Sequence, residues 1–230
     1  KQHSTDADLI QEADYMLVYS AYEQGRPNAV ELLKDYLDVY PASRHVDEVN
    51  FLIGSAHFGR GEYQKAIFWF NESNIDMLSS EQQEAYCFRL AYSFLQTGDM
   101  ERAYGYFARI EQIGTRYREA STYYVAYINY ATGKYNNALV EFTRLKDLPD
   151  YKERSLYYIT QIYFIQNKYE KVISEGKELL ASYPDSENNS EVYRIMGNAY
   201  YHLENENQAI NMLSKYVSST SDPLRGDLYI

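Results

Sequence analysis

The sequence is poor in cysteine and proline and contains no long apolar run. Cys87 is the only cysteine among the 230 residues, which excludes an internal disulfide and a multi-cysteine metal site. No apolar run approaches the roughly 20 residues needed to span a bilayer. No signal peptide is visible, but the chain begins at Lys1 without a methionine, which leaves open that an upstream segment has been removed. Because the chain has only 5 prolines and 11 glycines, without alternating β-branched runs, we expect it to be all-α.

Basic residues are also in deficit. There are 22 Lys and Arg against 33 Asp and Glu, a net charge of −11, which argues against nucleic acid and anionic membrane surfaces as partners. The acidic excess is largest in residues 1–80, with 13 acids and 6 bases. These charges either form solvated helix faces or attract a basic partner.

Residues suited to catalysis or metal binding are sparse. The four histidines are scattered without metal-ligand spacing, and the glycines are isolated at turns, so no phosphate loop is present. His57 and Cys87 fall on helix-packing positions. We therefore predict no enzyme, no metal and no cofactor. Four arginines form the only basic concentration, and we expect them either to pair with Glu101, Glu111 and Glu119 or to dock an acidic segment: Arg102, Arg109, Arg116 and Arg118.

What the sequence does contain is a repeat. Two helical apolar runs flank a Gly-Glu-Tyr turn at residues 61–63, and the same arrangement recurs along the chain. The turn positions are 25, 61, 98, 133, 167 and 204, separated by 36, 37, 35, 34 and 37 residues. A fixed period in this range indicates an array of helix-turn-helix repeats. Asn167 and Glu204 replace the turn glycine, so we expect the last two repeats to be less regular.

The apolar spacing places two helices in each repeat. The expected helices are 6–23, 28–40, 46–60, 63–77, 80–97, 100–113, 117–132, 135–146, 152–166, 169–182, 190–203 and 208–218. We expect one array with repeats at 6–43, 44–80, 81–116, 117–149, 150–188 and 189–221, and a thirteenth helix that starts at 222–230 and indicates a fragment of a longer protein. Ser80 and Gln83 have capping-box spacing.

Small residues recur where paired helices must approach closely. Gly54, Ala91, Ala126, Thr160 and Gly197 hold this place on the first helices, and Ala66, Ala103, Ala138 and Ala209 hold it on the second helices. Phe70, Phe107 and Phe142 are expected to fill the wider gaps toward the next repeat. No pair can bury its apolar face alone, so the stack is the stable unit.

The pattern of Gly54, Phe58, Gly61-Glu62-Tyr63, Ala66 and Phe70 resembles the tetratricopeptide-repeat family. The resemblance covers nearly the whole chain and implies an α-α superhelix that binds peptides along a concave wall made by the first helix of each pair. Two further segments, Tyr40-Pro41-Ala42-Ser43 and Tyr183-Pro184-Asp185-Ser186, resemble tetratricopeptide proteins of the bacterial envelope, such as the outer-membrane assembly lipoprotein. They favour a periplasmic or envelope location over the cytoplasm.

Helical spacing predicts that one stripe of each first helix faces this groove. The wall is expected to be aromatic, which accounts for much of the unusual total of 27 tyrosines. Tyrosine offers a large rigid contact area and one hydroxyl. Alternatively, the same rings pack against neighbouring first helices and meet no ligand. The predicted groove residues are Phe51, Phe58, Phe88, Tyr92, Tyr123, Tyr127, Tyr130, Tyr157, Phe164, Arg194, Asn198 and Tyr201.

The family also includes clamps for a chaperone's terminal carboxylate, which use Lys and Asn one helical turn apart. Here only Arg194 and Asn198 come close, so a co-chaperone role is not favoured. The first hypothesis is a non-catalytic scaffold that binds a peptide or partner domain in the aromatic groove. The alternatives are a structural subunit of a bacterial envelope assembly, and a regulatory array attached to an effector region outside this chain.

Overall fold

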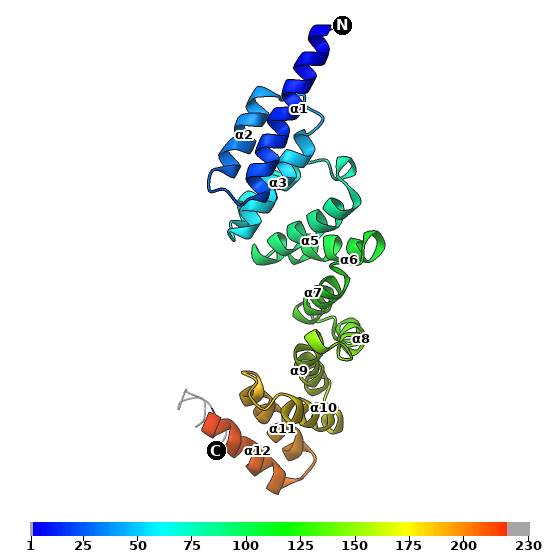
Figure 1. Cartoon of the computed structure of the whole chain (residues 1–230). Helices are drawn as coiled ribbons and strands as arrows, with labels where there is room; N and C mark the ends of the chain where they lie inside the picture. The colour runs from blue at the N-terminus through cyan, green and yellow to red at the C-terminus, as the bar shows by residue number, and fades with distance from the viewer. Residues whose placement is uncertain (1, 220–230) are drawn as a thin grey trace. The chain divides into compact units, whose positions relative to one another are not determined.

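A computed structural model describes residues 2–219 of the chain, which form twelve α-helices and one 3₁₀ turn (Figure 1). Contacts divide the chain into two compact units, Lys1–Ser121 and Thr122–Ile230. The helices are α1 (Gln2–Glu23), α2 (Ala29–Val39), α3 (Val46–Gly59), α4 (Tyr63–Asn71), η1 (Ile75–Met77), α5 (Ser80–Gln96), α6 (Met100–Ile113), α7 (Arg118–Ala131), α8 (Tyr135–Leu145), α9 (Pro149–Ile165), α10 (Tyr169–Ser182), α11 (Asn189–His202) and α12 (Glu206–Ser219). The all-α prediction is confirmed, and none of the helices in this part of the chain is long and apolar enough to cross a bilayer.

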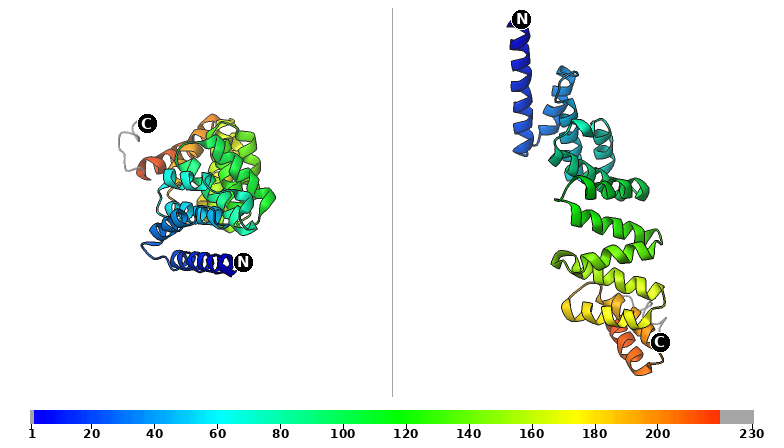
Figure 2. Two further views of the ribbon diagram at one scale, coloured as in Figure 1. Left: turned by 90° about the horizontal axis from the view of Figure 1, so that it is seen from above. Right: turned by 90° about the vertical axis from the view of Figure 1, so that its right-hand side faces the viewer.

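Six tight turns fold each pair of helices back on itself, as the views in Figure 2 show. All six predicted turn positions adopt a left-handed backbone, with φ from 56° to 88°. Four are glycines, which enter this region without steric cost. Asn167 (φ 56°) and Glu204 (φ 58°) take the same conformation. The last two turns are therefore as regular as the others, contrary to the expectation from sequence.

Glu204 should carry a local strain, because a left-handed backbone crowds the Cβ of a non-glycine residue by about 1 kcal/mol. We expect Glu204→Gly to raise the free energy of unfolding by about 1 kcal/mol. Asn167→Gly should change it less, because asparagine tolerates this region better. Urea denaturation of the two variants checks both values, and a destabilised Glu204→Gly variant would contradict the argument.

Close helix approach explains the small residues. A Cβ added at Gly54 would lie 2.7 Å from the ring of Phe70, and one at Gly197 would lie 2.7 Å from Leu213. The opposing small residues Ala66 and Ala209 are buried. Each pair therefore meets at the point that the repeat pattern predicts. In the second unit, Gly176 adds a further close contact, between α10 and Met196 of α11.

Two helix ends differ from the prediction. The capping box lies one residue earlier, with Ser79 Oγ accepting from the Gln82 amide and Gln82 Oε1 accepting from the Ser79 amide. Helix α4 ends at Asn71 rather than continuing to Met77, because Ser73 and Asn74 donate hydrogen bonds to Asp47 of α3 and pull the backbone away. The expected thirteenth helix lies outside the described residues.

Each Tyr-Pro-x-Ser segment makes the same connection between two helices. Tyr40 and Tyr183 end α2 and α10 with nearly equal backbone angles. The amides of Ser43 and Ser186 then donate to the carbonyls of those tyrosines at 3.1 and 3.2 Å. The motif therefore ends one helix and fixes the direction in which the next helix begins. In the first unit it is tied to α1, because Ser43 Oγ accepts from Gln11 and the Tyr40 hydroxyl donates to Asp14.

A carboxylate beside this connection links stability to pH. Glu12 pairs with His45 at 2.9 Å and with Arg44 at 2.7 Å. The hydrogen bond from His45 is the largest cause that holds the pKa of Glu12 below its usual value; partial burial opposes it, and Arg44 adds to it. The folded state therefore binds this proton less readily than the unfolded state. The resulting stability is present above the ordinary carboxyl pKa of about 4.3 and is lost as pH falls through the lower folded value.

We therefore expect acidification to lower the urea midpoint of the wild-type chain more than that of Glu12→Gln, which cannot titrate at this position. The comparison is made at pH values above and below about 4.3. Equal pH dependence of the two proteins would show that the pair contributes nothing to folding.

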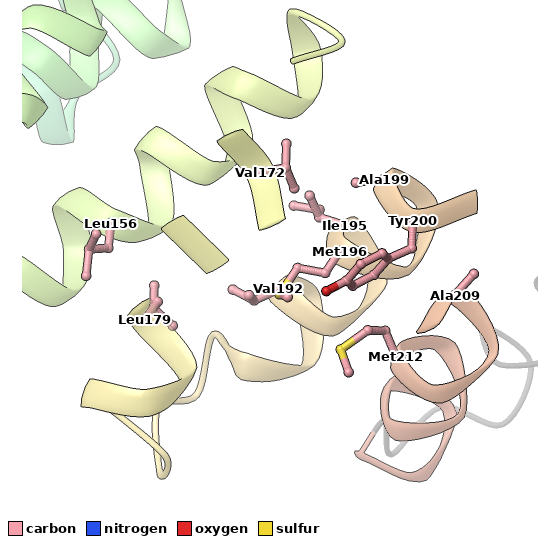
Figure 3. Packing of buried hydrophobic residues seen from close by; sticks show 10 residues of the cluster. All are labelled: Leu156, Val172, Leu179, Val192, Ile195, Met196, Ala199, Tyr200, Ala209 and Met212. Carbon is pink, nitrogen blue, oxygen red and sulfur yellow. The ribbon is translucent and has the colours of Figure 1, made fainter. Parts of the chain in front are cut away.

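The second unit contains a core between α9, α10, α11 and α12 (Figure 3). Val192, Ile195 and Met196 project from α11 toward α10, while Tyr200 reaches α12. A smaller cluster joins α7, α8 and α9 around Ala126, Ala138, Phe142 and Ile159. Burial of such apolar faces between successive helices is what stabilises a repeat array.

Candidate functional site

A cleft of about 630 Å³ opens in the first unit on the first helices of its three pairs, α1, α3 and α5. Its walls combine aromatic, acidic and basic side chains. They are Tyr19, Tyr22, Glu23, Glu48, Phe51, Leu52, Met77, Ser79, Glu81, Gln82, Ala85, Arg89 and Arg116. The volume is in the range of sites that hold small ligands or peptide side chains, about 300–1,000 Å³.

Arg89 lies in this cleft on α5. Its Nη1 donates to Ser55 Oγ of α3 at 2.6 Å, and its guanidinium lies 5.6 Å from the ring centroid of Phe51. Within the part of the chain that the structure describes, no carboxylate forms an ion pair with Arg89. Because a guanidinium carries five N–H donors, Arg89 is oriented by Ser55 and keeps donors for a ligand.

Tyr22 adds a hydroxyl beside this arginine. Burial raises the pKa of Tyr22, while Arg89 and Ser55, which interact with its hydroxyl, lower it. The phenol therefore stays neutral and can donate as well as accept. Tyr22, Ser55 and Arg89 form a polar group beside the ring of Phe51.

Most carboxylates around the cleft already have partners. Glu48 accepts from the Tyr15 hydroxyl at 2.6 Å and from Gln82 Nε2 at 2.5 Å. Glu81 pairs with Arg116 at 2.7 Å, and both are exposed at the surface. Glu48 and Glu81 are therefore engaged in hydrogen bonds, and a ligand group that enters the cleft meets Arg89 together with the carboxylate of Glu23.

The predicted groove residues of the first unit fall into two places. Phe51 lines the cleft and is only 4% exposed. Phe58 and Tyr92 are half-buried, with ring centroids 5.8 Å apart, and Phe88 is half-buried and stacked on Tyr117 at 4.6 Å. These three residues form ring contacts that join α3, α5 and Tyr117, which immediately precedes α7, and they do not line the cleft.

The second unit gathers its predicted tyrosines around a ring that sequence reasoning missed. Tyr158 of α9 lies 6.4, 6.0 and 5.0 Å from Tyr123, Tyr127 and Tyr130 of α7. The Tyr158 ring also stacks on Phe142 of α8 at 4.8 Å. Burial, followed by Tyr123, raises the pKa of Tyr158. Because all four tyrosines are half-buried, their rings are committed to one another and retain only part of their surface for a ligand.

No protein-family model matches the sequence, and no curated protein does either. Solved structures do match. YrrB, described as a TPR protein with an unusual peptide-binding site, has a TM-score of 0.67 at 12% identity over 83% of this chain and 95% of its own. A tetratricopeptide repeat protein from Parabacteroides merdae has a TM-score of 0.62 at 14% identity over 92% and 80%, and MamA has 0.62 at 15% over 76% and 91%. The chain has the tetratricopeptide-repeat (TPR) fold.

The remaining groove predictions lie near the C-terminal end of the TPR array. Tyr157 and Phe164 are half-buried beside Tyr158 and Tyr169, and Tyr201 is 67% exposed. Arg194 pairs with Glu191 on the same helix, and Asn198 Nδ2 donates to the Arg194 carbonyl. The two residues that come closest to a TPR carboxylate clamp are therefore engaged within α11.

The other candidate residues of this TPR chain are packed or paired. Cys87 is fully buried, and burial raises the pKa of its thiol to about 11, as expected for a core residue. His57 is buried as predicted, and its Nδ1 bonds Glu62. Arg102 pairs with Asp99, and Arg116 with Glu81. The expected partners of these two arginines were wrong, because Asp99 lies at the N-cap of α6 and Glu81 on the preceding first helix.

Proposed function

We propose that this chain is a non-catalytic scaffold that binds an extended segment of a partner protein in the first-unit cleft. The observation that carries the proposal is Arg89, held by Ser55 in a cleft of about 630 Å³ between α1, α3 and α5. The TPR fold, shared with a protein described as having a peptide-binding site, supports it.

The chemistry of the cleft suits a peptide. An extended segment presents backbone carbonyls that find no partner within the segment itself. Arg89 and the Tyr22 hydroxyl can donate to such a carbonyl or to a side-chain carboxylate. Tyr19 and Phe51 supply rigid apolar area for an adjoining side chain. The partner segment is therefore expected to carry an apolar residue next to an acceptor group.

The test is a selection of short random peptides on the immobilised chain, followed by fluorescence anisotropy with the selected peptides. Arg89→Ala is expected to weaken binding at least about ten-fold, equivalent to about 1.4 kcal/mol. Arg109→Ala, which removes an exposed arginine from α6, is the matched control and should bind as the wild type does. Tyr22→Phe removes only the hydroxyl of this residue, so its effect on peptide affinity measures what the hydroxyl contributes to binding.

Circular dichroism and urea midpoints establish that each variant is folded before binding is compared. Selected peptides that bind Arg89→Ala and the wild type equally would place the binding surface elsewhere and refute the proposal.

The second candidate function, a structural role, is favoured in the second unit. The contacts of Tyr158 with Tyr123, Tyr127 and Tyr130 occupy the surface that a groove ligand would need. In this proposal the first unit binds the peptide, and the tyrosines of α7 pack against α9.

A further inference from the structure

Helix α1 turns its apolar residues outward. Leu9, Ile10, Met16 and Leu17 are 56–68% exposed, and Ala13 and Ser20 are exposed between them. These six residues, spaced at three, four and seven, form one continuous stripe, called here the α1 stripe. The buried residues of α1 are instead Tyr15, Val18 and Ala21. In both views of Figure 2, α1 lies at the edge of the first unit, with α2 on its inner side.

The equivalent residues of the other first helices show how such a stripe is packed. Counted back from each turn residue, the counterparts of Ala13, Met16 and Leu17 in α3 are Val49, Leu52 and Ile53, which are all buried. In α5 the counterpart of Ala13 is Tyr86, whose ring lies 5.4 Å from Phe70 and whose hydroxyl donates to the Phe70 carbonyl. Phe70 belongs to α4, the second helix of the preceding pair.

The second unit repeats this arrangement. The counterparts of Met16 and Leu17 in α9 are Tyr158 and Ile159, which pack with Phe142 of α8. In α11 the counterparts of Ala13 and Leu17 are Val192 and Met196, which face Gly176 of α10 (Figure 3). In α5, α9 and α11, residues of this stripe therefore contact the second helix of the preceding pair. The counterpart of Met16 in α5 is the exception, because it is Arg89, which lies in the first-unit cleft. Within the described residues, nothing covers the α1 stripe.

Two of these covering helices bring a fully buried aromatic ring to the next pair. Phe70 of α4 lies against Tyr86 of α5, and Phe142 of α8 stacks on Tyr158 of α9. A cavity of about 310 Å³ between α1 and α2, lined by residues that include Leu17, Leu32 and Val39, offers a place for such a ring.

Charge determines the rest of the occupant. Helices α1 and α2 together carry eight carboxylates, at positions 6, 8, 12, 14, 23, 31, 35 and 38, and one lysine, Lys34. Asp14, Asp35 and Arg26 lie at the cavity itself, so its lining carries one net negative charge. Acidic flanks beside an apolar stripe attract a helix with Lys and Arg along its sides. An exposed apolar patch rimmed in this way is typical of an interaction surface.

We propose that the α1 stripe docks an amphipathic, basic-flanked α-helix of a partner protein, which packs on α1 as α4 packs on α5. The helix presents an aromatic side chain toward the cavity beside Leu17. This surface is separate from the cleft around Arg89, so it gives the scaffold a second binding mode.

The test uses two synthetic stapled helices that carry the apolar face of α8, with Ala and Phe four residues apart. One has lysines on its flanks and the other has glutamates. By fluorescence anisotropy, the lysine helix is expected to bind the chain, and the glutamate helix at least about ten-fold more weakly. Met16→Glu with Leu17→Glu should abolish binding of the lysine helix. Val140→Glu, which places the same charge at another exposed apolar position (58% exposed), is the matched control and should bind normally.

A second measurement does not require the separate lysine helix to bind the chain tightly. The lysine helix is fused to the N-terminus through a flexible linker, which raises its effective concentration to about the millimolar range. Amide exchange in α1 and α2 should slow in this fusion and not in its Leu17→Glu variant. Unchanged exchange in the fusion, or equal binding of the lysine and glutamate helices, would overturn the proposal. Self-association of the chain alone that disappears in Leu17→Glu would identify a second copy as the occupant and would also overturn it.

Discussion

Phe142→Ala is expected to lower the free energy of unfolding of the second unit by about 3–5 kcal/mol. Phe142 is fully buried in α8 and lies between two first helices. Its ring stacks on Tyr158 of α9 at 4.8 Å with an interplanar angle of 9°, and meets Tyr123 of α7 edge-on at 6.0 Å. Truncation therefore leaves a cavity at the point where three helices meet, and it removes two aromatic contacts as well as apolar burial.

Urea denaturation followed by circular dichroism gives the size of the effect, and amide exchange shows where it falls. Because repeat arrays need not unfold in one step, exchange should increase in α7, α8 and α9 before it increases in α1. Val140→Ala, two residues away and 58% exposed, should change stability by no more than about 0.5 kcal/mol. A loss below about 1 kcal/mol for Phe142→Ala would show that the site collapses around the smaller side chain.

The repeat is the part of the fold that could be predicted from sequence. Its period locates the six turns, and all six have the left-handed φ that a tight turn between antiparallel helices requires. The small residues follow from the same geometry, as at Gly54, where a Cβ would meet Phe70. Both features are local in sequence or recur at a fixed offset. A single sequence therefore contains enough information to place them.

The cleft could be predicted only in part. Phe51 was found because it lies on the expected stripe, whereas Tyr22 and Arg89 were missed. Arg89 is next to Phe88 in the chain and therefore lies about 100° around the helix from the predicted stripe. Its role depends on a contact with Ser55, 34 residues away. The angle at which neighbouring helices pack decides such contacts. The periodicity of residues within one helix does not contain that information.

Tyr158 was missed for the same reason, and it changes the interpretation of the tyrosines around it. Sequence spacing assigned Tyr123 and Tyr127 to a groove wall and left open whether they meet a ligand or pack together. In the structure Tyr123 contacts Phe142, Tyr151 and Tyr158, and Tyr127 contacts Tyr158. An aromatic pair contributes about 0.5–1.5 kcal/mol beyond its area burial, so these contacts favour packing.

The double variant Tyr123→Ala with Tyr127→Ala is therefore expected to lower the free energy of unfolding by about 2–4 kcal/mol, less than full burial of two rings would give because both are half-buried. Its effect should not add to that of Phe142→Ala, since Tyr123 touches Phe142 and neighbouring substitutions share contacts. Urea denaturation of the three proteins measures both the loss and the coupling.

The matched control is Tyr123→Phe with Tyr127→Phe, which keeps the rings and removes the hydroxyls. If the rings pack, this control retains wild-type stability, and peptides selected on the first-unit cleft bind it normally. If α7 is instead an open groove wall, the alanine variant keeps its stability within about 0.5 kcal/mol and loses a peptide that the Arg89→Ala variant still binds. The two outcomes differ in both stability and binding, so one pair of variants decides whether the tyrosines of the second unit hold the array together or hold its partner.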